Sequence, residues 1–181
     1  MSAPDIGSIV GLFRHVHRLK TTPRTGWLRH GIEKPESIAA HAYGVALLAW
    51  VLAGRDVDVG KALKMALVHD LGEALAGDLT PQDKGYERES IIVAEKLREI
   101  VSPLPEGLRN EFVSLYGELV SMKTEEARLV NMADDLDLAL TATEYQRSGP
   151  DLREFLDVDE RDFTERGREL IKYLKRLGDS E

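Results

Sequence analysis

Three ionisable side chains, His69, Asp70 and Glu73, lie within five residues of an apolar segment. On a helix, His69 and Asp70 point about 100° apart and can flank one point, while Glu73 lies one turn from His69 on the same face. An isolated His-Asp pair is more often a structural contact, but His41 lies in an earlier apolar-periodic segment and Asp134 in a later one. Two histidines and two aspartates suit a borderline divalent metal. The sequence therefore predicts one divalent ion held by these four side chains, and their types do not distinguish Mn, Co, Mg, Zn and Ni.

Three amphipathic helices are expected to position these ligands, because apolar residues recur in each segment at three- and four-residue spacing. Each segment begins with a side chain, from Ser37, Asp58 or Thr124, whose oxygen can accept a hydrogen bond from a free backbone N–H. The expected helices run from Ser37 to about residue 53, from Asp58 to about residue 76, and from Thr124 to about residue 147.

The rest of the chain also indicates helices. They are expected at about residues 6–20, 86–101, 108–120 and 160–177, with an interruption at Gly117. Residues 21–36 hold two prolines and two glycines without a helical period, so they are expected to form a functional loop around Arg24 and Trp27. No segment reads as a strand, a repeat or a low-complexity tract. The sequence predicts an all-α fold, a compact helical bundle that forms a single domain over residues 1–181.

Composition narrows the function classes. The 181 residues are 43% apolar, which is enough for one sizeable core, and the absence of cysteine excludes disulfides, thiolate metal sites and cysteine nucleophiles. The net charge of −8 argues against binding to nucleic-acid polymers or anionic membranes. The chain start lacks a signal-peptide pattern and no apolar run is long enough for a membrane span, so a cytoplasmic protein is expected. An anionic substrate must then be held locally, by a metal or a few placed cations.

Acidic residues crowd the long helix, where Asp134, Asp135 and Asp137 fall within four positions. Their charges repel one another, so a cation would be needed to keep the inward-facing carboxylates ionised, unless all three are solvated. Periodicity alone does not decide which of the three is the metal ligand. Asp78 lies in the loop just beyond the helix that carries the expected ligands, where its simplest interpretation is a turn or cap residue.

The order of a His, a His-Asp doublet and a distant Asp resembles the HD-domain superfamily of metal-dependent phosphohydrolases. Within that superfamily the chain is most similar to the HD-domain 5′-deoxynucleotidases. The matching segments extend from about residue 19 to residue 147, and comprise Pro23-Arg24-Thr25-Gly26-Trp27, Pro35-Glu36-Ser37, Ala66-Leu67-Val68-His69-Asp70, Glu73, Gly77-Asp78-Leu79-Thr80-Pro81 and Thr143-Glu144-Tyr145.

The resemblance implies an enzyme that removes the 5′-phosphate from deoxynucleoside monophosphates with a bound divalent metal. It implies the ligand set His41, His69, Asp70 and Asp134, and so selects Asp134 among the three acids. By the same resemblance, Glu73 would act on the attacking water and Asp78 would lie near the sugar and the leaving oxygen. Arg24 would hold the phosphate, and Trp27 would pack where a ribose 2′-hydroxyl would otherwise lie.

Two other functions stay open. One is a phosphohydrolase acting on a different nucleotide, but larger polyphosphates call for several basic residues, and the mapped loops offer only Arg24, Arg29, Lys34 and Lys84. The other is a non-catalytic regulatory or binding protein that contains a metal. Two further carboxylates, from Glu73 and Asp78, argue against it, since a purely structural metal site does not need them.

The expected partners are a small-molecule nucleotide and a second copy of the chain. A homodimer is expected mainly from the family resemblance. Phe112, Leu115 and Tyr116 add to this expectation, because they are more apolar surface than one small core is expected to need.

Overall fold

The computed structural model describes residues 3–147 and 149–178, and within these ranges all regular structure is helical apart from an isolated β-bridge between Pro23 and Ser37. The predicted all-α class is confirmed. In chain order the elements are α1 (Ile6–Thr21), α2 (Thr25–Arg29), α3 (Ile38–Leu52), α4 (Val59–Val68), α5 (Glu73–Ala76), the 3₁₀ helix η1 (Tyr86–Arg88), α6 (Glu89–Val101), α7 (Glu106–Ser121), α8 (Glu125–Gln146), the 3₁₀ helices η2 (Arg153–Leu156) and η3 (Glu160–Asp162), and α9 (Glu165–Gly178).

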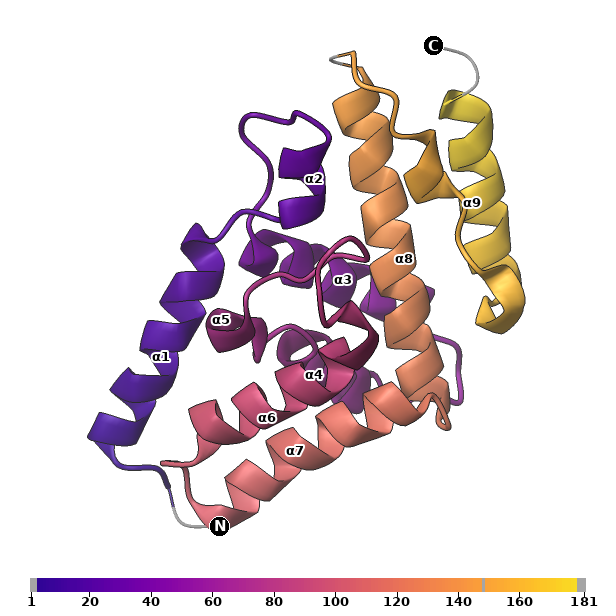
Figure 1. Ribbon diagram of the computed structural model, residues 1–181. Helices are drawn as coiled ribbons and strands as arrows, with labels where there is room; N and C mark the ends of the chain where they lie inside the picture. Colours follow the sequence, from indigo (N-terminus) through magenta and orange to yellow (C-terminus); the bar gives the residue numbers. More distant parts are fainter. Residues whose placement is uncertain (1–2, 148, 179–181) are drawn as a thin grey trace.

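The long helix α8 runs through the middle of the molecule, with α9 beside it and α6 and α7 packed together (Figure 1). Helix α3 packs against both α8 and α4. The three predicted N-caps are confirmed, because side-chain oxygens of Ser37, Asp58 and Thr124 accept hydrogen bonds from backbone N–H groups one turn on. Capping thus sets where the helices carrying the candidate metal ligands begin.

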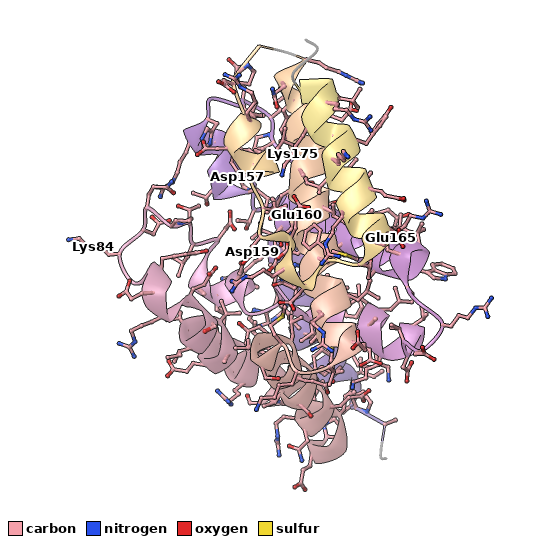
Figure 2. All side chains as sticks on the ribbon, turned by 90° about the vertical axis from the view of Figure 1, so that its right-hand side faces the viewer. Lys84, Asp157, Asp159, Glu160, Glu165 and Lys175 are labelled. Carbon is pink, nitrogen blue, oxygen red and sulfur yellow. The ribbon has the colours of Figure 1, made fainter. Side chains whose placement is uncertain are left out.

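The main core lies where α3, α4, α8 and α9 meet. Val45, Met65, Leu136 and Ile171 are fully buried there, and small alanines on α3, α4 and α8 let the helices approach closely. Burying each large apolar side chain contributes about 1.5–3 kcal/mol. Next to this core, Nζ of Lys175 on α9 donates a hydrogen bond to Oε1 of Glu160 on η3 at 2.9 Å (Figure 2).

The apolar side chains of α7 belong to the core. Leu115 and Tyr116 are buried, and Phe112 packs against the cluster formed by α1, α5, α6 and α7. The prediction that these side chains exceed what one core needs is therefore wrong. Helix α7 also continues through Gly117 without the expected interruption.

Between Asp58 and residue 76, where one continuous helix was predicted, the helix is interrupted. Helix α4 ends at Val68, residues 69–72 form turns, and α5 begins at Glu73. The N–H groups of Leu71, Glu73 and Ala74 each donate to the carbonyl three residues back, so the chain tightens after α4. The expected loop at residues 21–36 contains the unpredicted helix α2, and the expected last helix is divided into η3 and α9. The predicted break after α8 begins at Ser148, which lies outside the described residues.

Gly72 explains why the tightened turn can pack against α6. A Cβ atom at this position would lie 2.3 Å from the backbone oxygen of Val93. Gly72→Ala is therefore expected to lower the free energy of unfolding by about 1–3 kcal/mol, the usual cost of overpacking. Urea titration of the folded protein measures this change.

Gly117→Ala is the matched control, because no described atom other than its chain neighbours and nearby backbone of its own helix lies within 4 Å of the added Cβ. It is expected to raise stability by about 0.5–1 kcal/mol, since glycine is unfavourable inside a helix. Equal stabilities for Gly72→Ala and the wild type would contradict this account of the turn.

Candidate functional site

Three helices bring together side chains that are far apart in the sequence. His41 lies on α3, His69 is the C-cap of α4, and Asp134 lies in the middle of α8. One ligand atom from each of the three lies within 4.8 Å of the others. Asp70 joins them, with Oδ2 at 3.1 Å from Nε2 of His69 and 3.8 Å from Nε2 of His41. The structure thus brings together all four residues predicted as ligands.

Hydrogen bonds to the Nδ1 atoms orient both imidazole rings. Nδ1 of His69 lies 2.7 Å from the backbone oxygen of Ala66, and Nδ1 of His41 lies 2.8 Å from Oδ2 of Asp137. Because a carbonyl oxygen only accepts, the proton of neutral His69 is assigned to Nδ1. The same assignment holds for His41 beside an ionised carboxylate. In these neutral forms, both Nε2 atoms keep a lone pair that can bind a metal.

The inner atoms of this cluster lack hydrogen-bond partners. Among the described residues, the buried Nε2 atoms of His41 and His69, Oδ1 of Asp134 and Oε2 of Glu73 make no hydrogen bond. Nε2 of His41 and Oδ1 of Asp134 are only 2.9 Å apart but are not aligned for one. Leaving such groups unsatisfied is costly, and a divalent cation would satisfy them. The residues present therefore fit a divalent metal.

Electrostatics in the cluster depend on burial and on close neighbours. Burial by itself lowers the pKa of His41, but the carboxylates of Asp134 and Asp137 outweigh it and raise this pKa to about 10. Burial by itself raises the pKa of Asp70, but His69 outweighs it and holds the pKa below its usual range. For Glu73, burial and the nearby Asp70 charge both raise the pKa well above the ordinary value. A proton or a metal ion is thus needed to balance the acids.

Arg24 supplies the cation nearest to this cluster. Its Nη1 atom lies 3.1 Å from Oδ1 of Asp78, 3.2 Å from Oδ2 of Asp70 and 3.8 Å from Oε2 of Glu73. The other oxygen of Asp78 accepts a hydrogen bond from the backbone N–H of Thr25, the first residue of α2. Asp78 therefore holds both the Arg24 side chain and the start of the helix that follows it.

Trp27 forms a wall of the site. Its side chain is only 1% exposed, and its Nε1 donates to Oε1 of Glu36 at 3.0 Å. The indole lies against Phe155, with ring centroids 4.4 Å apart, and edge-on to Tyr145 at 5.3 Å. These contacts tie α2 to α8 and to η2.

A pocket of about 560 Å³ opens beside the cluster. It is lined by six of the predicted site residues, namely Arg24, Trp27, Asp70, Glu73, Asp78 and Asp134. His41 and His69 lie behind this wall, buried in the core. The pocket is large enough for a small ligand.

A family model described as "HD domain" matches residues 16–177. The chain belongs to the HD-domain family. It is 36% identical to "5′-deoxynucleotidase HDDC2" of Mus musculus, over 81% of this chain and 75% of the relative. It is 39% identical to the protein of the same name from Dictyostelium discoideum, over 75% of this chain and 76% of the relative. Among solved structures, it is similar to a protein from Pyrococcus horikoshii OT3, with a TM-score of 0.80 and 35% identity, over 93% of this chain and 99% of that one.

Sequence reasoning missed part of the pocket of this HD-domain protein. The lining residues that it missed include His30, Tyr86, Glu89, Glu154 and Phe155. Glu154 and Phe155 come from η2, which lies beyond the matching motifs, and the connector has no periodicity that could have indicated them. Asp137 was considered only as an alternative ligand. In the part of the chain that the structure describes, no helix is long and apolar enough to cross a membrane.

Proposed function

We propose that this HD-domain protein is a metal-dependent phosphohydrolase that removes the 5′-phosphate from deoxynucleoside monophosphates. Relatives named 5′-deoxynucleotidase, at 36% and 39% identity, support this substrate. The observation that carries the proposal is the convergence of buried, unpartnered atoms from His41, His69 and Asp134 beside the guanidinium of Arg24. A cation and an arginine are a sensible minimum for binding a phosphate dianion on an acidic protein.

His41, His69, Asp70 and Asp134 would hold one divalent ion. When bound, such an ion neutralises charge on the phosphoryl oxygens and makes water a better nucleophile at neutral pH. Activity with each added metal distinguishes among Mn, Co, Mg, Zn and Ni.

The chain's own residues perform the remaining steps. Arg24 donates hydrogen bonds to the phosphate, which requires its guanidinium to exchange carboxylate contacts for phosphate oxygens. Glu73 accepts a proton from the attacking water through its unpartnered Oε2. Asp78 positions Arg24 and lies near the sugar and the leaving oxygen. Trp27 closes the side of the pocket where a ribose 2′-hydroxyl would otherwise lie.

The arrangement of cations favours a monophosphate over a polyphosphate. Of the basic residues in the mapped loops, Arg24 and Arg29 line the pocket, and Arg29 is paired with Asp83 at 2.5 Å. Lys84 extends away from the protein (Figure 2). A substrate with several phosphates would find few free cations here, so a phosphohydrolase acting on larger nucleotides stays the second candidate.

Phosphate release from a panel of ribonucleotides and deoxynucleotides, each with different added metals, tests the proposal. Deoxynucleoside 5′-monophosphates are expected to be hydrolysed fastest, and a chelator is expected to abolish the release. Faster hydrolysis of di- or triphosphates would favour the second candidate. Metal binding without turnover of any member would favour a regulatory or binding protein instead.

We also infer that the protein forms a homodimer, and that the cytoplasm is its location. Helix α3 supports self-association, because its 15 residues include no Asp, Glu, Lys or Arg. Four of its large apolar side chains are exposed, Tyr43 (67%), Leu47 (40%), Trp50 (61%) and Val51 (76%). Leu67 on the neighbouring α4 is exposed by 65%. Exposed apolar surface of this kind is typical of protein interfaces.

Trp50→Asp tests the homodimer, because a buried carboxylate would oppose association through α3. Light scattering at micromolar concentration is expected to give a dimer mass for the wild type and a monomer mass for the variant. Val120→Asp, at an exposed position on α7, is the control and should stay dimeric. A wild type that is monomeric at this concentration would refute the inference.

A further inference from the structure

The two histidines of the candidate metal centre are held in different ways. The ring of His69 is oriented from its own helix, through the backbone oxygen of Ala66 at 2.7 Å. The ring of His41 is oriented from another helix, through the side chain of Asp137 on α8 at 2.8 Å. His41 is fully buried, and the Asp137 side chain is 13% exposed. The direction of the His41 ring thus depends on one carboxylate that the proposed reaction has not used.

Two acids on one face of α8 enclose this ring. Asp134 and Asp137 lie three residues apart, so their side chains are neighbours on the helix surface. Oδ1 of Asp134 lies 2.9 Å from Nε2 of His41, and Oδ2 of Asp137 lies 2.8 Å from Nδ1. Each carboxylate therefore faces a different nitrogen, and the Asp134 side is the one that His69 shares.

Gly44 makes room for the Asp137 carboxylate. A Cβ atom on Gly44 would lie 2.0 Å from Oδ1 of Asp137 and 2.8 Å from its Cγ. Gly44 follows His41 by three residues on α3, so the missing side chain opens a space next to the imidazole. The carboxylate fills this space with one oxygen and reaches Nδ1 of His41 with the other.

A further carboxylate near His41, that of Glu36, already accepts a hydrogen bond from another residue. Ligand atoms of Glu36, His41 and Asp137 all lie within 4.8 Å of one another. Oε1 of Glu36, however, accepts the hydrogen bond from Nε1 of Trp27 at 3.0 Å. Asp137 is therefore the acid that forms a hydrogen bond with Nδ1 of His41, while Glu36 holds Trp27 in the wall of the pocket.

We propose that Asp137 is a positioning residue for the metal centre, which aims Nε2 of His41 at the ion by holding Nδ1, and that Gly44 is the residue that admits its carboxylate. The proposal rests on the proposed function in one respect, the assignment of His41 as a ligand. A carboxylate that accepts the Nδ1 proton fixes the tautomer and the ring direction, and it makes Nε2 a stronger donor to the metal.

The affinity for Mn²⁺, measured by calorimetry, and the visible spectrum of the Co²⁺-loaded protein test this role. Asp137→Asn keeps the size of the side chain and removes its charge, and we expect Mn²⁺ to bind about 10–100-fold more weakly, as for other residues that support metal ligands. The Co²⁺ spectrum is expected to shift, because the field of the His41 ligand changes. Glu144→Gln is the matched control, since it removes an exposed charge from the same helix, and it should change neither measurement.

Gly44→Ala supplies an independent test of the same contact. In the wild type it is expected to weaken Mn²⁺ binding as Asp137→Asn does, because the added Cβ displaces the carboxylate. In the Asp137→Ala background it is expected to cause no further loss, because the clash is gone. If Gly44 and Asp137 acted independently of each other, their effects on Mn²⁺ binding would add instead.

The outcomes separate this inference from the metal site itself. Wild-type Mn²⁺ affinity and an unchanged Co²⁺ spectrum in Asp137→Asn would overturn the positioning role. A wild type that binds neither Mn²⁺ nor Co²⁺ would refute the proposed metal site instead.

Discussion

Replacement of Asp134 by alanine is expected to remove the bound metal and nearly all phosphate release. Asp134 is the ligand proposed for α8, and its Oδ1 is buried, makes no hydrogen bond and lies 2.9 Å from Nε2 of His41. A metal that neutralises transition-state charge contributes several kcal/mol, so at 1.36 kcal/mol per factor of ten the rate should fall by about 10³-fold or more. Metal content after gel filtration and kcat/KM with added metal measure the two effects.

Asp135→Ala is the control for this prediction. Asp135 is the next residue, lines the same pocket and also carries a carboxylate. Burial and the adjacent Asp134 raise the pKa of Asp135 to about 7, so its charge is not held by a strong partner. The variant is expected to keep the metal. Loss of metal from Asp135→Ala but not from Asp134→Ala would show that the wrong aspartate was chosen.

The sequence predicted the helices that are defined by local features. Ser37, Asp58 and Thr124 cap their helices as expected, because a cap needs only a side-chain oxygen and a free N–H nearby. The break after Val68 was not predictable in this way. It depends on the approach of Gly72 to the backbone of Val93, which comes from α6 and is set by tertiary packing.

In the candidate site too, some features follow from local sequence and others only from tertiary packing. Residue types and apolar spacing indicated His41, His69 and Asp70 before their positions were known, because metal ligands are chemically restricted. The choice of Asp134 among three neighbouring acids came from the family resemblance. The part played by Asp137 depends on the rotation of α8 against α3, and periodicity cannot supply that rotation. The sequence singled out Trp27 as a loop residue. The pocket wall that Trp27 forms also includes Phe155 from η2, and the contact between these two rings follows only from the fold.

Glu73→Ala separates an enzyme from a binding protein, and it is expected to slow phosphate release by about 10²–10⁴-fold, the usual contribution of general acid–base assistance. Oε2 of Glu73 is buried, makes no hydrogen bond and belongs to a residue of the pocket wall. Burial and Asp70 raise the pKa of Glu73 well above its ordinary value. A divalent charge nearby opposes this rise and favours the ionised form that can accept a proton from water. Metal content and substrate affinity should change little, and both are measured beside the single-turnover rate.

Two companion variants make the assignment of Glu73 specific. Asp78→Ala is expected to slow turnover and also to raise KM, because Asp78 holds Arg24 at 3.1 Å and the start of α2. Its effect should be larger on substrates whose sugar or leaving oxygen it contacts. Glu154→Gln changes a carboxylate that lines the same pocket and pairs with His30, and it should leave the chemical step unchanged. Near-normal turnover of metal-loaded Glu73→Ala would show that Glu73 is not catalytic. Loss of the metal from that variant would show instead that Glu73 is a ligand and that the four-residue site is incomplete.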